Sequence, residues 1–95
     1  TFIKLNGVVM EWLVIDVIYI KSTRHYILTL HSASLKMMAE VLTEYPVNTG
    51  DVLYPVRDAE YLINKKEFQR LRFFSASLFS VTHWNSLKNE RHHEM

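Results

Sequence analysis

The chain has 95 residues, of which 48% are hydrophobic and 13% aromatic, enough for a single domain over residues 1–95 with its own core. A charged fraction of 22% and a formal net charge of +1 argue against disorder and against nucleic-acid binding through bulk positive charge. The absence of cysteine excludes disulfides, thiolate zinc sites and thiol catalysis. The apolar run Val8–Ile20 contains two carboxylates and is too short to span a bilayer, so we expect a cytoplasmic protein without a membrane segment.

The N-terminal part has the composition of β-strands. Phe2–Leu5 is a short strand candidate, Asn6-Gly7 is a hairpin turn signal, and Val8–Ile15 resumes as a strand. Asp16 interrupts the apolar run. The strand either bends at this carboxylate or gives way to a new one, because a buried carboxylate without a partner is costly.

A β-hairpin is predicted between Val17 and His31. Val17–Ile20 is β-branched or aromatic at every position, and His25–His31 alternates like a strand with two different faces. The residues between them, Lys21–Arg24, are polar. They form a turn with two cations, and a histidine follows directly.

A helix is predicted from about residue 34 to residue 45. A serine at its start is a suitable N-cap, and Leu35, Met38 and Leu42 recur at helical spacing. Pro46 ends the segment, because proline disfavours helical backbone in the residue before it. On this prediction the apolar stripe packs on the sheet, and Leu42→Ala should cost about 2–5 kcal/mol as a core truncation.

After a strand at Val52–Tyr54, the segment 58–72 allows two interpretations. A helix over these residues would place polar side chains in its apolar stripe. We favour the alternative: a short strand Tyr61–Ile63, a turn at 64–67 and a strand through Arg70–Phe74.

The C-terminal part combines a further β segment with a helix. Phe73–Val81 continues as a strand or hairpin, and His83–Met95 has the pattern of a short polar helix around Trp84. The predicted fold class is therefore α+β, with mainly antiparallel β-strands, one well-formed helix at about 34–45 and a short C-terminal helix.

Neither a metal site nor a catalytic site is indicated. Among the five histidines, His25 and His31 share a strand face about 20 Å apart, and His92-His93 lie in a polar tail. The sequence lacks a nucleophile motif, paired carboxylates in an apolar context and a glycine-rich phosphate loop. We therefore expect no cofactor and no enzymatic activity. A small ribonuclease, which needs only a few cationic groups, is the enzyme class left open.

Cationic side chains gather in three places, each in or near a predicted turn or element end. The clusters are Lys21, Arg24 and His25; Arg57 with Lys65, Lys66, Arg70 and Arg72; and His83, Lys88 and Arg91 with His92 and His93. A solvated surface is the simplest account of any one cluster. Because the net charge is near zero, a nucleic-acid surface would have to be local.

The order of the pieces resembles the LytTR DNA-binding domain, the output module of many bacterial response regulators. Matching segments are Ile15–Ser22 with Arg24–His31 for its opening hairpin, Ser34–Leu42 for its single long helix, Leu53–Asn64 for its central segment and Phe79–His83 for its closing element. The resemblance extends over about residues 3–88. Two groups differ, since Arg57-Asp58-Ala59 replaces a His-Arg-Ser and Thr82–Asn85 replaces a run of arginines.

The LytTR resemblance implies bacterial transcription control by a domain that reads double-stranded DNA through loops. The residues that it implies at base edges are Arg24, His25, Arg57, Asp58, Thr82 and His83, with Lys21 and Lys88 on phosphates.

A second hypothesis is a small protein-binding module without DNA binding, such as a phage- or mobile-element-encoded inhibitor or an antitoxin-like partner. The near-neutral charge, the many aromatic residues and the missing arginine run favour it. Some of the large aromatic side chains would then serve a protein-partner or homodimer face.

Overall fold

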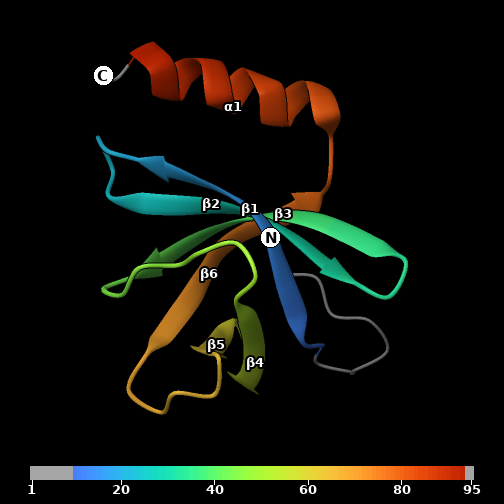
Figure 1. Cartoon of the computed structure of the whole chain (residues 1–95), viewed down its shortest axis with the longest axis vertical. Helices are drawn as coiled ribbons and strands as arrows, with labels where there is room; N and C mark the ends of the chain where they lie inside the picture. Colours follow the sequence, from blue (N-terminus) through green and yellow to red (C-terminus); the bar gives the residue numbers. More distant parts are fainter. Residues whose placement is uncertain (1–9, 94–95) are drawn as a thin grey trace.

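The computed structural model describes residues 10–93 and shows a barrel of antiparallel strands followed by one helix (Figure 1). The elements are β1 (Trp12–Ile20), β2 (His25–Ser32), β3 (Leu35–Thr43), β4 (Val52–Arg57), β5 (Glu60–Ile63), β6 (Arg70–Leu78) and α1 (Val81–His93). The barrel is closed in the order β1-β2-β3-β6-β5-β4. The strand predicted at Phe2–Leu5 and the turn at Asn6-Gly7 lie outside the described residues.

The predicted hairpin is confirmed as β1 and β2. Their pairing runs from Ile20 opposite His25 at the turn to Leu13 opposite His31 at the far end. In the turn, Arg24 has a left-handed backbone with a φ of 62°, and its N–H donates to the Ile20 carbonyl at 2.8 Å.

Strand β1 continues through Asp16 instead of ending there. A β-bulge shifts the register between Val14 and Asp16, and the N–H of Val17 donates to Asp16 Oδ1 at 2.9 Å. A bulge bends a strand and increases its twist. The carboxylate therefore marks a bend in one long strand.

The helix predicted at about 34–45 is wrong, because this segment forms strand β3. It lies between β2 and β6 and pairs with both, and these two ladders outweigh its helix propensity. Met37, Ala39 and Val41 point into the barrel and are at most 2% exposed. Leu42 faces outward at 50% exposure, so its predicted place in the core is also wrong.

The strand–turn–strand interpretation of residues 58–72 is confirmed, and the helix alternative is wrong. β5 pairs with both β4 and β6. The chain turns toward β6 at Asn64 and Lys65, whose φ angles of 54° and 61° are left-handed. Asn64 suits this backbone, and its Oδ1 accepts the Val52 N–H at 2.9 Å, which holds the turn against β4.

The predicted α+β class is wrong, since the described chain is a β-barrel with one C-terminal helix. β6 runs as one strand to Leu78, and α1 begins at Val81 and not at His83. All the strands contribute buried apolar side chains to the barrel interior. They are Trp12, Val14, Leu28, Leu30, Met37, Ala39, Val41, Leu53, Tyr61, Ile63, Leu71 and Phe73. Within residues 10–93, no helix has the length and apolar character needed to cross a membrane.

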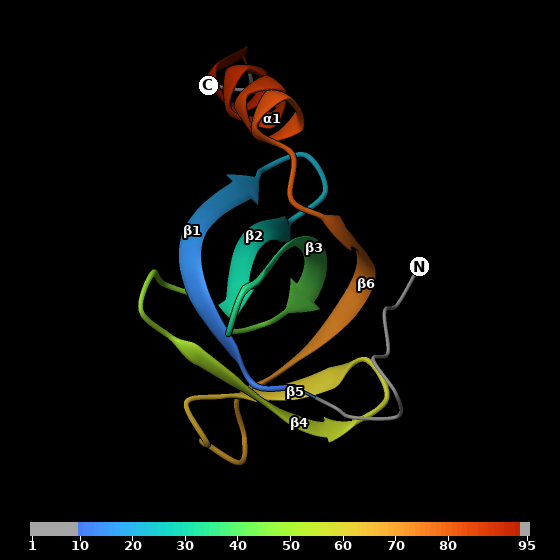
Figure 2. The same cartoon turned by 90° about the vertical axis from the view of Figure 1, so that its right-hand side faces the viewer.

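Helix α1 lies outside the barrel (Figure 2) and is attached to it by a second apolar cluster. This cluster contains Ile18, Met38 and Trp84, all of them buried. The Trp84 indole Nε1 donates to Asp16 Oδ2 at 3.0 Å, and Lys88 Nζ lies 3.3 Å from the same oxygen. The carboxylate at the β-bulge thus anchors α1 to β1.

Candidate functional site

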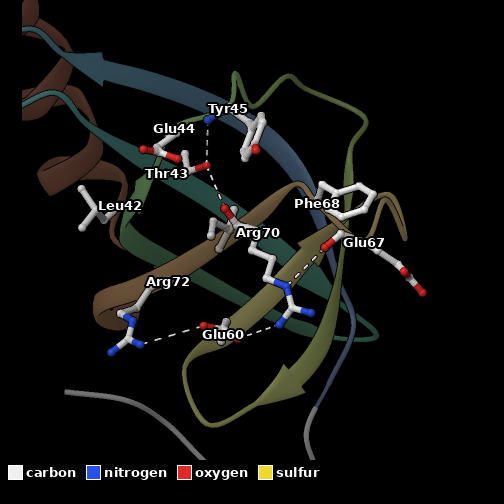
Figure 3. Close-up of a pocket in the computed structure, with 10 residues that line it drawn as sticks. Leu42, Thr43, Glu44, Tyr45, Glu60, Glu67, Phe68, Arg70 and Arg72 are labelled. Carbon is white, nitrogen blue, oxygen red and sulfur yellow. Dashed lines mark hydrogen bonds and ion pairs between the residues drawn. The ribbon is translucent and has the colours of Figure 1, made fainter.

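An open groove of about 750 Å³ lies on the outer side of the barrel (Figure 3). One wall is the end of β3 with the residues that follow it, and the other comprises the start of β5, the β5–β6 turn and the start of β6. The lining residues are Leu42, Thr43, Glu44 and Tyr45 on the first side, and Glu60, Glu67, Phe68, Arg70, Leu71 and Arg72 on the second. Its volume lies within the range of small-molecule sites.

The hydroxyl of Thr43 links the two walls of the groove through Arg70 and also holds the backbone of its own wall through Tyr45. Thr43 Oγ1 donates to the Arg70 carbonyl oxygen at 3.0 Å and accepts the Tyr45 N–H at 3.0 Å. β3 and β6 are also paired here, with Leu42 opposite Arg72. The groove is therefore built on ordered strands, which fix the positions of its side chains.

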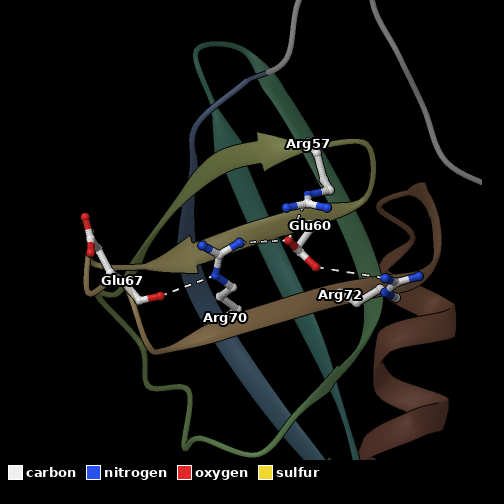
Figure 4. A network of polar contacts seen from close by, with 5 residues as sticks. All are labelled: Arg57, Glu60, Glu67, Arg70 and Arg72. Atoms are coloured by element: carbon white, nitrogen blue, oxygen red, sulfur yellow. Dashed lines mark hydrogen bonds and ion pairs between the residues drawn. The ribbon is translucent and has the colours of Figure 1, made fainter.

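Three arginines surround one carboxylate at the edge of the groove (Figure 4). Arg70 Nη1 lies 3.0 Å and Arg57 Nε 3.2 Å from Glu60 Oε1. Arg72 Nη2 lies 3.9 Å from the other oxygen of Glu60. We call these four residues the arginine strip. Three guanidinium charges face one carboxylate, so the strip carries an excess of positive charge.

The register of the sheet explains how the strip forms. Glu60 on β5 stands opposite Arg72 on β6 and opposite Arg57 on β4. Arg70 Nε also donates to the backbone oxygen of Glu67 at 3.3 Å, while the Glu67 carboxylate points away from the arginines (Figure 4). The strip thus crosses the outer faces of three neighbouring strands.

Two large apolar side chains beside the arginine strip are exposed. Phe68 is 85% exposed and Leu42 is 50% exposed. Exposed apolar groups that line a groove together are typical of binding surfaces. The chemistry of the groove is therefore suited to binding, with guanidinium donors for anions beside an apolar contact.

The residues that the LytTR resemblance implied as DNA contacts are distributed over separate parts of the structure. Lys21 and Arg24 lie in the β1–β2 turn, Thr82 and His83 in the first turn of α1, and Arg57 and Asp58 where β4 leads to β5. The β1–β2 turn and the start of α1 lie at opposite ends of that helix, and β4 and β5 lie at the far end of the barrel (Figure 1). Of these residues, Arg57 belongs to the arginine strip.

The remaining two predicted DNA contacts take part in internal pairs. His25 pairs with Glu40 on β3, and its ring lies against Phe74 with 5.5 Å between centroids. Lys88 pairs with Asp16, as described above. Within residues 10–93, no three His, Cys, Asp or Glu side chains gather closely enough to hold a metal ion.

Asp16 has a perturbed acidity that follows from its role as an anchor. Burial by itself would raise the pKa of Asp16. The Val17 N–H, the Trp84 indole and the charge of Lys88 outweigh burial and hold the pKa below its ordinary value. The fold thus favours the ionised carboxylate, which keeps α1 in place.

The family model of the IraM/PmrD proteins matches residues 10–85. The chain belongs to the IraM/PmrD family. The "Signal transduction protein PmrD" of Salmonella typhimurium is 38% identical over 80 residues, covering 82% of this chain and 94% of that protein. The Escherichia coli protein of the same name is 36% identical over 77 residues, covering 79% of this chain and 88% of that protein.

Two solved structures of PmrD proteins share the barrel. The crystal structure of Escherichia coli PmrD has a TM-score of 0.78 at 35% identity, over 84% of this chain and 98% of that one. The solution structure of PmrD from Klebsiella pneumoniae has a TM-score of 0.70 at 32% identity, over 81% and 96% of the two chains. The barrel is therefore a fold shared with PmrD proteins.

Membership of the IraM/PmrD family overturns the LytTR assignment, and DNA binding in transcription control is the wrong function. The LytTR resemblance required a long helix at Ser34–Leu42, and all of that segment after Ser34 lies in β3. The second hypothesis, a small protein-binding module, agrees better with relatives named signal transduction proteins.

The sequence indicated the cations of the groove but not the exposed apolar side chain of Phe68 beside them. Arg70 and Arg72 belong to one of the three cationic clusters, and they alternate with Leu71 and Phe73, which is a signal for a shared outer face. Phe68 carries no comparable signal, because an isolated phenylalanine is normally a core residue.

Proposed function

We propose that this protein is a signal transduction protein that acts by binding another protein and not by catalysis. The observation that carries the proposal is the 38% identity to the Salmonella typhimurium protein of that description, over 94% of its length. The groove supports it, because arginine and aromatic side chains are enriched at protein interfaces. We place this activity in the cytoplasm, in keeping with a chain that has no cysteine.

The partner in this proposal is a different protein and not a second copy of the chain. A symmetric contact through the groove would place the same patch of both copies face to face. The arginine strip of one copy, with Arg57, Arg70 and Arg72, would then oppose the same cations of the other. Juxtaposed like charges cost several kcal/mol, which disfavours the homodimer at this surface.

Complementation tests the proposed function. The chain is expressed in Salmonella typhimurium and Escherichia coli strains whose own PmrD gene is deleted, and the transcripts whose levels change on that deletion are measured. We expect the chain to restore the transcript pattern in at least one host, because the similarity to both relatives extends over most of its length. The host's own PmrD and an empty vector are the controls. If the chain accumulates in folded form and restores neither pattern, the proposal is wrong.

A further inference from the structure

We infer that the groove binds an acidic segment of the partner protein that also carries an apolar side chain. The inference rests on the proposed function, since it names the chemistry of the partner. It combines two neighbouring features: the excess positive charge of the arginine strip at the edge of the groove, and the exposed side chains of Phe68 and Leu42 that line the groove.

The arginine strip has unused capacity for carboxylates. Glu60 is within hydrogen-bond distance of Arg70 and Arg57, but its contact with Arg72 at 3.9 Å is longer than a hydrogen bond. The Arg72 and Arg57 side chains are 67% and 70% exposed. A guanidinium offers five N–H donors and can donate two parallel hydrogen bonds to one carboxylate. The single carboxylate of Glu60 therefore cannot satisfy all three guanidinium groups.

Glu60 also prepares the strip for a partner. Its side chain is only 18% exposed, and it draws guanidinium groups from two neighbouring strands toward one point. The Glu67 carbonyl holds Arg70 Nε from the other side at 3.3 Å. Side chains that are already ordered lose less entropy on binding, which favours association.

The exposed apolar side chains of the groove favour a partner segment that carries apolar as well as acidic side chains. Phe68 stands 85% exposed at the β5–β6 turn, and Leu42 lies on the opposite wall. Apolar side chains of a partner packed against each of them would remove them from water, at roughly 25 cal/mol per Å² of apolar surface buried. A segment with acidic and apolar side chains engages both parts.

A protein segment suits this surface better than the backbone of a nucleic acid. Glu60 lies among the cations, and Glu44 and Glu67 also line the groove. These carboxylates would repel a continuous chain of phosphates, which requires an unbroken positive track. They leave room for separate acidic side chains at Arg57 and Arg72, which are the most exposed cations of the strip.

A fluorescence anisotropy titration of the purified chain tests the inference. The probe is a labelled synthetic peptide in which Glu and Asp alternate with Leu and Phe, and the comparison peptide has Lys in place of each acid. We expect only the acidic peptide to bind, with an affinity that falls as salt is raised, because exposed charges are screened. Arg72→Gln and Phe68→Ser should each weaken binding about tenfold.

Lys21→Gln is the matched control for Arg72→Gln. It removes the same charge from an exposed side chain in the β1–β2 turn, which contributes no residue to the groove lining, and should change affinity less than about twofold. Thermal unfolding of each variant shows that the barrel is intact. The inference is overturned if neither peptide or both peptides bind, or if Lys21→Gln weakens binding as much as Arg72→Gln. Displacement of the acidic peptide by duplex DNA at equal charge would also overturn it, since the groove would then bind polyanions in general.

Complementation with the Arg72→Gln and Phe68→Ser variants separates this inference from the proposed function. If the unaltered chain restores the transcript pattern and both variants do so equally, the groove assignment is wrong while the signalling proposal holds. If the unaltered chain fails in both hosts, the signalling proposal fails whatever the peptide does.

Discussion

Side chains along β3 differ sharply in burial. Met37 is 2% exposed and Leu42 is 50% exposed. In a strand, residues an odd number apart face opposite sides of the sheet. Met37 therefore points into the barrel, whereas Leu42 points outward into the groove. Met38 shares the outward face of Leu42 but is buried, because α1 covers it.

Two alanine substitutions test this alternation. Met37→Ala should lower the free energy of unfolding by about 2–5 kcal/mol, because it leaves a cavity inside the barrel. Leu42→Ala should lower it by less than about 1 kcal/mol, because half of that side chain is already in water. Urea unfolding of both variants measures the difference. A loss for Leu42→Ala as large as that for Met37→Ala would contradict the strand.

Asp16 makes the attachment of α1 sensitive to acid. Its folded-state pKa is lowered, so the ionised form stabilises the fold. This contribution is fully present above the unfolded pKa of about 3.9 and is lost as the pH falls through the lower folded-state value.

An NMR titration that follows the Trp84 indole N–H tests the anchor. This proton donates to Asp16 at 3.0 Å, so its resonance should shift as the carboxylate is protonated, with a midpoint below about 3.9. Asp16→Asn should abolish this step while the indole of Trp12, inside the barrel, serves as the internal control. A midpoint above the ordinary aspartate value, or a step that persists in Asp16→Asn, would contradict the assignment.

At the scale of elements, the hairpins were predictable and β3 was not. Val17–Ile20 and His25–His31 combine β-branched residues with a polar turn, so local signals agree with the final structure. Residues 35–43 have apolar side chains at both helical and alternate spacing, and their Met, Ala, Leu, Glu and Lys favour helix. Pairing with β2, which directly precedes β3 in the chain, and with β6, which is distant in sequence, decides between them, and the spacing within residues 35–43 does not reveal the pairing with β6.

The groove was partly predictable, because some of its residues are neighbours in sequence and others are brought together only by strand pairing. The cations at Arg70 and Arg72 lie close in sequence and were recognised as one cluster with Arg57. Their convergence on Glu60 depends on the register of β4, β5 and β6, which sequence spacing alone does not give. The exposure of Leu42 was not predicted, because the helix expected at this segment placed Leu42 in the core.

On the scale of the whole molecule, α1 and the β5–β6 turn that lines the groove lie far apart. α1 lies at one end of the long axis, and the β5–β6 turn lies at the other (Figure 1). The family match over residues 10–85 takes in the entire barrel and only the start of α1. The barrel is therefore the part on which the proposed binding function depends, with the groove as its contact surface.

Photo-crosslinking in living cells tests most directly whether the groove contacts a partner protein. Phe68 is replaced by p-benzoylphenylalanine in the chain expressed in the complemented Salmonella typhimurium strain, and Lys21 in the β1–β2 turn is replaced likewise as the control. We expect a discrete crosslinked protein from position 68 and not from position 21, and mass spectrometry should locate the crosslink in a segment rich in Glu and Asp. Crosslinks from position 21 alone, or from position 68 to a segment without acidic residues, would contradict the account.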